Sequence, residues 1–93
     1  MTVDEILEEI IKLAIKYDIG CVILTGSYAK GTFTRYSDID IAVKDAEKID
    51  KFEEDVDDLP TLHSIDIINL DTCSNKFLLE DIKKYGRKIY AKV

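Results

Sequence analysis

The sequence predicts a single small α/β (α+β) domain over residues 1–93, in which one mixed four-stranded sheet packs with helices. Three observations favour this fold class. The length of 93 residues suits one domain, and 46% hydrophobic with 34% charged residues is typical of a soluble globular chain. Segments with an apolar period of three to four residues alternate with short apolar runs. Together they predict the order helix, strand, strand, helix, strand, helix, strand.

The first helix is predicted from apolar residues that recur every three or four positions. These residues are Val3, Ile6, Leu7, Ile10, Ala14 and Tyr17. Thr2 and Glu5 have the spacing of a capping box at the helix start. Gly20 is expected to end the helix, because glycine commonly follows the last helical turn.

Two predicted strands follow, joined by a polar connection. The apolar run over residues 21–25 is too short for a helix and predicts a strand covered on both faces, with a short helical turn over 28–30. Residues 38–43 alternate in polarity, as a strand with two different faces does. One face carries Ile39, Ile41 and Val43, and the other carries Asp38, Asp40 and Ala42.

The second half of the chain contains a helix and a strand that flank a proline. Residues 45–59 have helical apolar spacing and a charged outer surface, and Pro60 marks the end of this helix. Residues 62–70 predict a third strand. One face of that strand carries Ser64, Asp66 and Ile68.

The last two predicted elements are a helix over residues 75–85 and a strand over residues 87–93. Ser74 is the expected N-cap of the helix, and Gly86 is its expected C-terminal glycine. Ile89, Ala91 and Val93 alternate along the final strand.

The charge and the apolar runs exclude several classes of partner. A net charge of −6 disfavours direct binding to long nucleic acid, which needs clustered lysine and arginine. No run reaches the roughly 18 to 20 apolar residues of a membrane span, and the acidic start is unlike a secretory signal, so a cytoplasmic location is expected. Cys21 and Cys73 lack the spacing of a zinc site and are expected to be free, buried thiols.

Three aspartates on predicted strands indicate a cation site. Asp38 and Asp40 are about 6.6 to 6.8 Å apart in Cα when they share a strand face, so both carboxylates can approach one cation or two neighbouring cations. Asp66 adds a third carboxylate if its strand lies beside theirs. Mg²⁺ prefers oxygen ligands and is held by one or two carboxylates together with substrate phosphates. The pattern therefore predicts a metal–nucleotide site.

A glycine–serine turn provides the second half of this site. The strand over residues 21–25 ends at Gly26 and Ser27, where a turn into a helix start leaves backbone N–H groups free to face an anion. The hydroxyl of Ser27 is a further donor. This turn is expected to hold phosphates.

These motifs resemble the signature of the DNA polymerase β-type nucleotidyltransferase superfamily. The phrases "GSYAKGT", "SDIDIAV" and "IDIINL" are similar to those of its minimal nucleotidyltransferases, over essentially the whole chain. The resemblance implies that Gly26 and Ser27 hold the nucleotide phosphates, and that Asp38, Asp40 and Asp66 are the catalytic, Mg²⁺-binding carboxylates of a two-metal site that uses ATP.

Two basic residues near these motifs are candidate phosphate contacts. Lys30 stands where many relatives have arginine, a change that keeps the charge and alters the geometry. Arg35 lies in the loop before the paired aspartates, within reach of a triphosphate, although loop arginines are usually solvated. Tyr28 and Tyr36 have two interpretations, since each either stacks on a base or partner or packs against the core.

The resemblance also implies a partner. Minimal nucleotidyltransferases are commonly antitoxins of a HEPN-domain toxin, and some transfer AMP from ATP to a toxin tyrosine, so a hetero-oligomer with such a toxin is expected. Two alternatives stay open. The first is a binding module that neutralises its partner by complex formation alone, and the second is nucleotidyl transfer to a small molecule.

Overall fold

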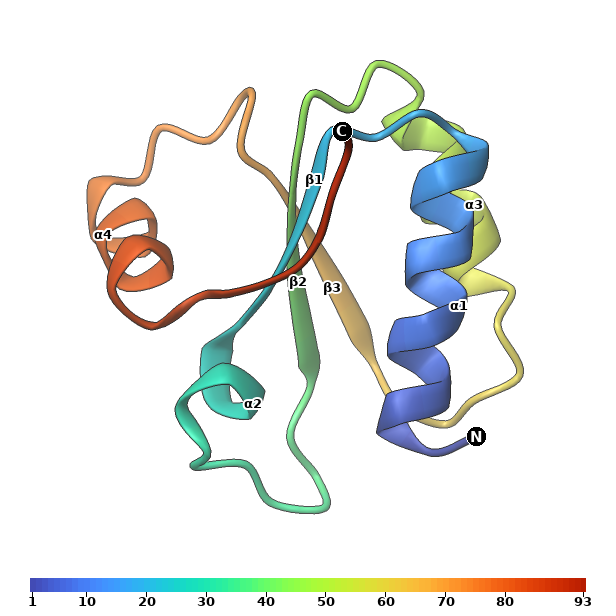
Figure 1. The fold of residues 1–93 in the computed structure, drawn as a ribbon. Coiled ribbons are helices and arrows are strands. Elements are labelled where there is room, and N and C mark those ends of the chain that lie inside the picture. Colours follow the sequence, from blue (N-terminus) through green and yellow to red (C-terminus); the bar gives the residue numbers. More distant parts are fainter.

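The computed structural model describes all 93 residues and has four helices and four strands (Figure 1). The strands form one mixed sheet in the order β3-β2-β1-β4, in which β1 is antiparallel to β2 and β4 while β2 and β3 are parallel. This confirms the predicted fold class. The elements are α1 Val3–Lys16, β1 Cys21–Thr25, α2 Gly26–Lys30, β2 Ile39–Lys44, α3 Ile49–Asp57, β3 Ile65–Asn69, α4 Lys76–Tyr85 and β4 Arg87–Ala91.

Helix α1 begins at the predicted capping box. The backbone N–H of Glu5 donates to Thr2 Oγ1 at 3.2 Å, and the N–H of Thr2 donates to Glu5 Oε1 at 3.0 Å. The helix ends earlier than predicted, because Asp18, and not Gly20, adopts the left-handed conformation with φ 57°. The N–H of Ile19 then donates to the carbonyl of Ala14 at 2.9 Å, as in a Schellman motif.

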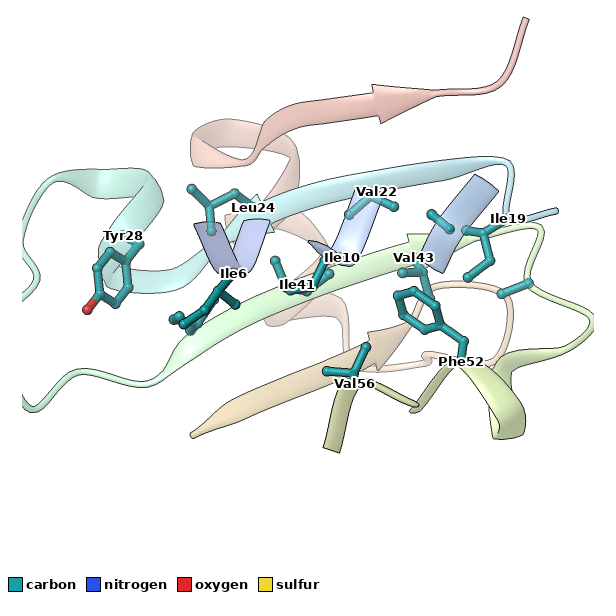
Figure 2. Close-up of a cluster of buried hydrophobic side chains, with 13 residues drawn as sticks. Ile6, Ile10, Ile19, Val22, Leu24, Tyr28, Ile41, Val43, Phe52 and Val56 are labelled. Atoms are coloured by element: carbon teal, nitrogen blue, oxygen red, sulfur yellow. The ribbon is translucent and has the colours of Figure 1, made fainter. Parts of the chain in front are cut away.

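The core lies between one face of the sheet and helices α1 and α3 (Figures 1 and 2). The alternation predicted for β2 is confirmed, since Ile39, Ile41 and Val43 are all fully buried. The largest fully buried side chain, Phe52, comes from α3. Figure 2 shows that these side chains meet those of Ile6 and Ile10 from α1. Burial of these large apolar groups orders the sheet and fixes where β2 presents its other face.

The opposite face of the sheet is covered less completely than the sequence predicted. Helix α4 lies on this side (Figure 1), and Cys21 and Ile23 of β1 are only half-buried. Cys21 and Cys73 are free thiols, as expected, but both are half-buried and not buried. The expectation that β1 is covered on both faces is therefore only partly met, because the residues on its second face are half-buried. On this face Asp40 of β2 is half-buried and Asp66 of β3 is exposed, whereas Ala42 of β2 is fully buried.

Further boundaries differ from prediction, among them the end of α3 at Asp57 and not at 59, and the end of β4 at Ala91 and not at 93. Helix α3 begins at Ile49, and not at 45, because Asp45 is left-handed with φ 56° and interrupts any helix there. Strand β3 begins at Ile65, and not at 62. The side chain of Asn75, and not that of Ser74, caps α4 by accepting a hydrogen bond from the N–H of Leu78 at 3.2 Å.

The position after α4 requires glycine for a different reason from the one predicted. Gly86 has φ −61° and ψ 142°, an extended conformation that any residue adopts. A Cβ on Gly86 would instead collide with the carbonyl of Ile82 and lie 2.8 Å from Cγ2 of Ile23. Gly86 therefore permits close packing of the α4–β4 junction on β1. None of the helices is both long enough and apolar enough to span a membrane.

Candidate active site

The end of β1 and the start of α2 bring the glycine–serine turn against the β2 carboxylate. Thr25, the last residue of β1, is paired with Asp40 of β2. Gly26 follows with φ 67°, a left-handed conformation that favours glycine. A Cβ on Gly26 would collide with Oδ2 of Asp40 and lie 3.1 Å from its Cγ. The backbone of Gly26 therefore packs directly on the Asp40 side chain.

The parallel pairing of β2 with β3 brings two carboxylates together. Asp40 and Asp66 are directly opposite each other in the register of these strands and project from the sheet face away from α1 and α3. The sequence analysis predicts that Asp66 joins the site if its strand lies beside β2, and the structure confirms that the two strands are neighbours. Asp38 lies one residue before β2, in the connection and not in the strand, and its side chain is exposed.

Burial and, to a smaller extent, neighbouring negative charge both disfavour the ionised form of Asp40. Burial of this half-buried group raises the pKa of Asp40, and the negative charges of Asp66 and then Asp38 raise that pKa further. No basic side chain forms an ion pair with any of the three. A bound cation would reverse this penalty, because opposite charge favours the ionised carboxylate.

The donor set fits a hard cation. All three side chains offer carboxylate oxygens, which Mg²⁺ prefers, and the adjacent Asp40 and Asp66 match the one or two protein carboxylates that typically hold it beside substrate phosphates. The side chains are not arranged as a complete three-residue metal cage. The missing oxygen ligands therefore have to come from the substrate, from water, or from a rotation of the exposed Asp38.

The two predicted basic contacts have partners of their own. Lys30 Nζ lies 2.9 Å from Oδ1 of Asp81 and 5.1 Å from the centroid of the Tyr85 ring, so Lys30 joins α2 to α4. The guanidinium carbon of Arg35 lies 5.1 Å from the centroid of the Tyr36 ring. Contact of either side chain with a phosphate stays a prediction.

The sequence interpretation missed the support that α4 gives to this end of the site. Asp81 and Tyr85 are four residues apart in α4 and therefore share a helix face, where they bracket Lys30. That spacing is visible in the sequence, but the docking of α4 on α2 is not. Of the two tyrosines, Tyr28 is buried and takes the core role, whereas Tyr36 is exposed.

The structure therefore combines a mixed sheet, a glycine–serine turn after β1 and aligned carboxylates on β2 and β3, as the sequence resemblance implied. The model of the family described as polymerase beta, nucleotidyltransferase matches residues 8–93. The chain belongs to this family. No curated protein sequence matches the chain.

Solved structures of toxin–antitoxin complexes are similar to this chain. One is a toxin–antitoxin with AMP-PNP, 28% identical with a TM-score of 0.68, where the match covers 91% of this chain and 73% of the other. A second is an MntA–HpeT toxin–antitoxin mutant with two aspartates changed to glutamate, 26% identical with a TM-score of 0.66 and the same coverage. A tyrosine-to-alanine mutant of MntA–HpeT is 27% identical with a TM-score of 0.65, covering 92% and 72%. These similarities agree with the resemblance to minimal nucleotidyltransferase antitoxins.

Proposed function

We propose that this chain is a Mg²⁺-dependent nucleotidyltransferase that transfers AMP from ATP to a tyrosine hydroxyl of a HEPN-domain toxin and thereby acts as its antitoxin. The observation that carries the proposal is the contact of Gly26 with Asp40, which is in turn aligned with Asp66. The turn that we propose to bind phosphate thus lies beside paired carboxylates. Family membership and the similarity to toxin–antitoxin structures, one of them with AMP-PNP, support the same reaction.

Different residues are proposed to bind the phosphates and the metal and to accept the proton. Gly26 and Ser27 would bind the phosphates that leave as pyrophosphate, and Asp38 with Asp40 would hold the Mg²⁺ ions, with Asp66 as a third ligand. When bound, Mg²⁺ supplies positive charge that neutralises the triphosphate in the transition state. Asp66 would accept the proton of the acceptor hydroxyl as its oxygen forms a bond to the α-phosphorus and the bond from that phosphorus to pyrophosphate breaks.

The exposure of the carboxylates matches these roles. Asp40 is half-buried and packed against Gly26, so its position is fixed by the fold. Asp38 and Asp66 are exposed and accessible to an acceptor that approaches from solution. The positioning of substrate and metal on a preorganised carboxylate is expected to supply most of the rate enhancement.

The test is the intact mass of the protein encoded beside this chain after incubation with the chain, ATP and Mg²⁺. A gain of one or more AMP units is expected, together with its loss in Asp40→Asn and in Asp66→Asn. Asp50→Asn is the matched control, because Asp50 is exposed on α3, which covers the other face of the sheet. Full transfer by Asp40→Asn would refute the assignment. Toxin neutralisation by an inactive Asp40→Asn variant would instead favour neutralisation by complex formation alone.

Transfer to a small hydroxyl compound is the remaining alternative. Incubation of such a compound with the chain, ATP and Mg²⁺, but without any partner protein, tests it directly. Modification of the compound at a rate similar to that of the protein acceptor would replace the toxin as the proposed substrate. No modification would leave the protein acceptor as the substrate class.

A further inference from the structure

The connection between α2 and β2, residues 31–38, is held by specific hydrogen bonds. The N–H of Thr32 donates to the carbonyl of Ser27 at 3.0 Å, which joins this segment to the proposed phosphate-binding turn. The N–H of Thr34 donates to Ser37 Oγ at 2.8 Å, and the N–H of Ser37 donates back to the Thr34 carbonyl at 3.1 Å. Residues 31–38, called the site loop below, therefore have a defined conformation.

An aromatic stack attaches the site loop to α2. The rings of Tyr28 and Phe33 are parallel within 10° and their centroids are 4.6 Å apart. Tyr28 is buried in the core, so the ring on which Phe33 packs is held in place. Even so, 53% of Phe33 is exposed. The stack holds one face of the Phe33 ring and leaves the remainder of the ring to solvent.

Tyr36 is the most exposed aromatic residue of the site loop. Its exposed fraction is 82%, and its hydroxyl makes no hydrogen bond within the domain. The guanidinium carbon of Arg35 lies 5.1 Å from the centroid of its ring. Arg35 is the only basic residue of the site loop, and Asp38, one of the three site carboxylates, is its only acidic residue. The loop therefore presents two exposed aromatic rings and one cation beside the carboxylates.

We propose that the site loop is the surface that recognises the acceptor protein, with Tyr36 as its central contact. This inference rests on the proposed function, which requires a protein acceptor. Tyrosine is enriched among the residues that dominate protein interfaces, and a loop ordered before binding loses little conformational entropy on association. Phe33 extends the apolar area beside Tyr36.

The position of Tyr36 in the chain suits this role. Tyr36 precedes Asp40 by four residues, so their Cα atoms are at most about 14 Å apart. A folded protein that binds Tyr36 can thus reach the carboxylates at the same time. The fitting partner surface has an apolar pocket for the phenol ring and an acidic rim that faces Arg35, with the acceptor hydroxyl beside that pocket.

A competing occupant is the base of the nucleotide, because an exposed ring also stacks on a purine. Measurements on Tyr36→Ala separate the two. Recognition of the acceptor protein predicts a weaker complex with that protein and an unchanged KM for ATP. Stacking on the base predicts a higher KM for ATP and an unchanged complex with the protein.

The experiment measures the dissociation constant of the complex with the protein encoded beside this chain, by calorimetry without ATP. Tyr36→Ala is expected to weaken the complex at least tenfold, and Tyr36→Phe is expected to retain most of the affinity. Phe77→Ala is the matched control, because Phe77 is 86% exposed on α4, outside the site loop, and this variant is expected to change the affinity less than twofold.

Three outcomes would overturn the inference. They are an unchanged dissociation constant in Tyr36→Ala, an equal loss of affinity in Phe77→Ala, and a wild-type chain that does not bind the adjacent protein. Failure of the proposed function is seen separately, as a wild-type complex that forms but transfers no AMP. In that case the calorimetric comparison still decides whether the site loop is the interface.

Discussion

Replacement of Gly26 by alanine tests whether the Gly26–Asp40 contact organises the site. The chain has two left-handed glycines, Gly26 with φ 67° and Gly31 with φ 75°. A Cβ on Gly26 would collide with Oδ2 of Asp40, whereas a Cβ on Gly31 would meet no atom within 4 Å. Gly31→Ala therefore reports the cost of the backbone conformation alone, and Gly26→Ala reports that cost together with displacement of Asp40.

The expected magnitudes follow from these two terms. A left-handed alanine costs roughly 1 to 2 kcal/mol, so Gly31→Ala should lower the free energy of unfolding by about that amount. For a domain of this size each 1 kcal/mol lowers Tm by about 4 to 8 °C. Gly26→Ala should lose roughly 1 to 3 kcal/mol more from overpacking. It should also move the Asp40 carboxylate by roughly 1 Å, a displacement that can reduce turnover by about 100-fold.

Two assays separate stability from catalysis. Urea denaturation of both variants gives the free energies of unfolding, and intact mass spectrometry of the acceptor protein gives the rate of AMP transfer at a temperature where both variants are folded. Gly26→Ala should transfer AMP about 100-fold more slowly than Gly31→Ala. Equal transfer rates in the two folded variants would refute the claim that Gly26 positions Asp40.

Three further predictions concern stability. Burial and neighbouring negative charges raise the pKa of Asp40, so its ionisation at neutral pH destabilises the fold. Asp40→Asn should therefore raise Tm in the absence of Mg²⁺. The same variant should abolish the increase in Tm that Mg²⁺ with ATP produces, and differential scanning fluorimetry measures both effects. Phe52→Ala should lower the free energy of unfolding by about 3 to 5 kcal/mol in urea titrations, because the ring is fully buried. The N–H groups of Asp45 and Ala46 donate to the Asp71 carboxylate and lower its pKa, so this stabilisation is present near pH 7 and is lost as the pH falls through the depressed pKa. Asp71→Asn should therefore reduce the pH dependence of stability below about pH 4, and an unchanged pH profile would contradict this role.

The elements of the fold were largely predictable because each carries a local signal. The helical period of α1 and its Thr2–Glu5 capping box identify the first helix, and alternation identifies the buried face of β2. The helix boundaries were less predictable where a residue other than glycine adopts a left-handed conformation. Asp18 and Asp45 do so, and hydrogen bonds that form only in the folded chain stabilise these two conformations.

The candidate site was predictable in its parts and not in its assembly. The Gly26–Ser27 turn and the paired aspartates are recognisable motifs, but alignment of Asp66 with Asp40 depends on parallel pairing of β2 with β3. The ion pair of Lys30 with Asp81 similarly depends on how α4 docks. Such long-range contacts are set by packing of the whole domain, and a short sequence motif does not encode them.

The position of β3 at the edge of the sheet has a consequence for how the site is lost. Gly26 directly follows β1 and Asp40 lies on β2, and both of these strands are in the interior of the sheet, whereas Asp66 is held by backbone pairing to a single neighbouring strand. Edge strands open at lower free energy than central strands. Fraying of β3 would therefore remove Asp66 from its place opposite Asp40 while the core under β1 and β2 stays folded. Heating should consequently inactivate the protein below its unfolding temperature. A partner that covers the β3 edge would raise the inactivation temperature toward the unfolding temperature.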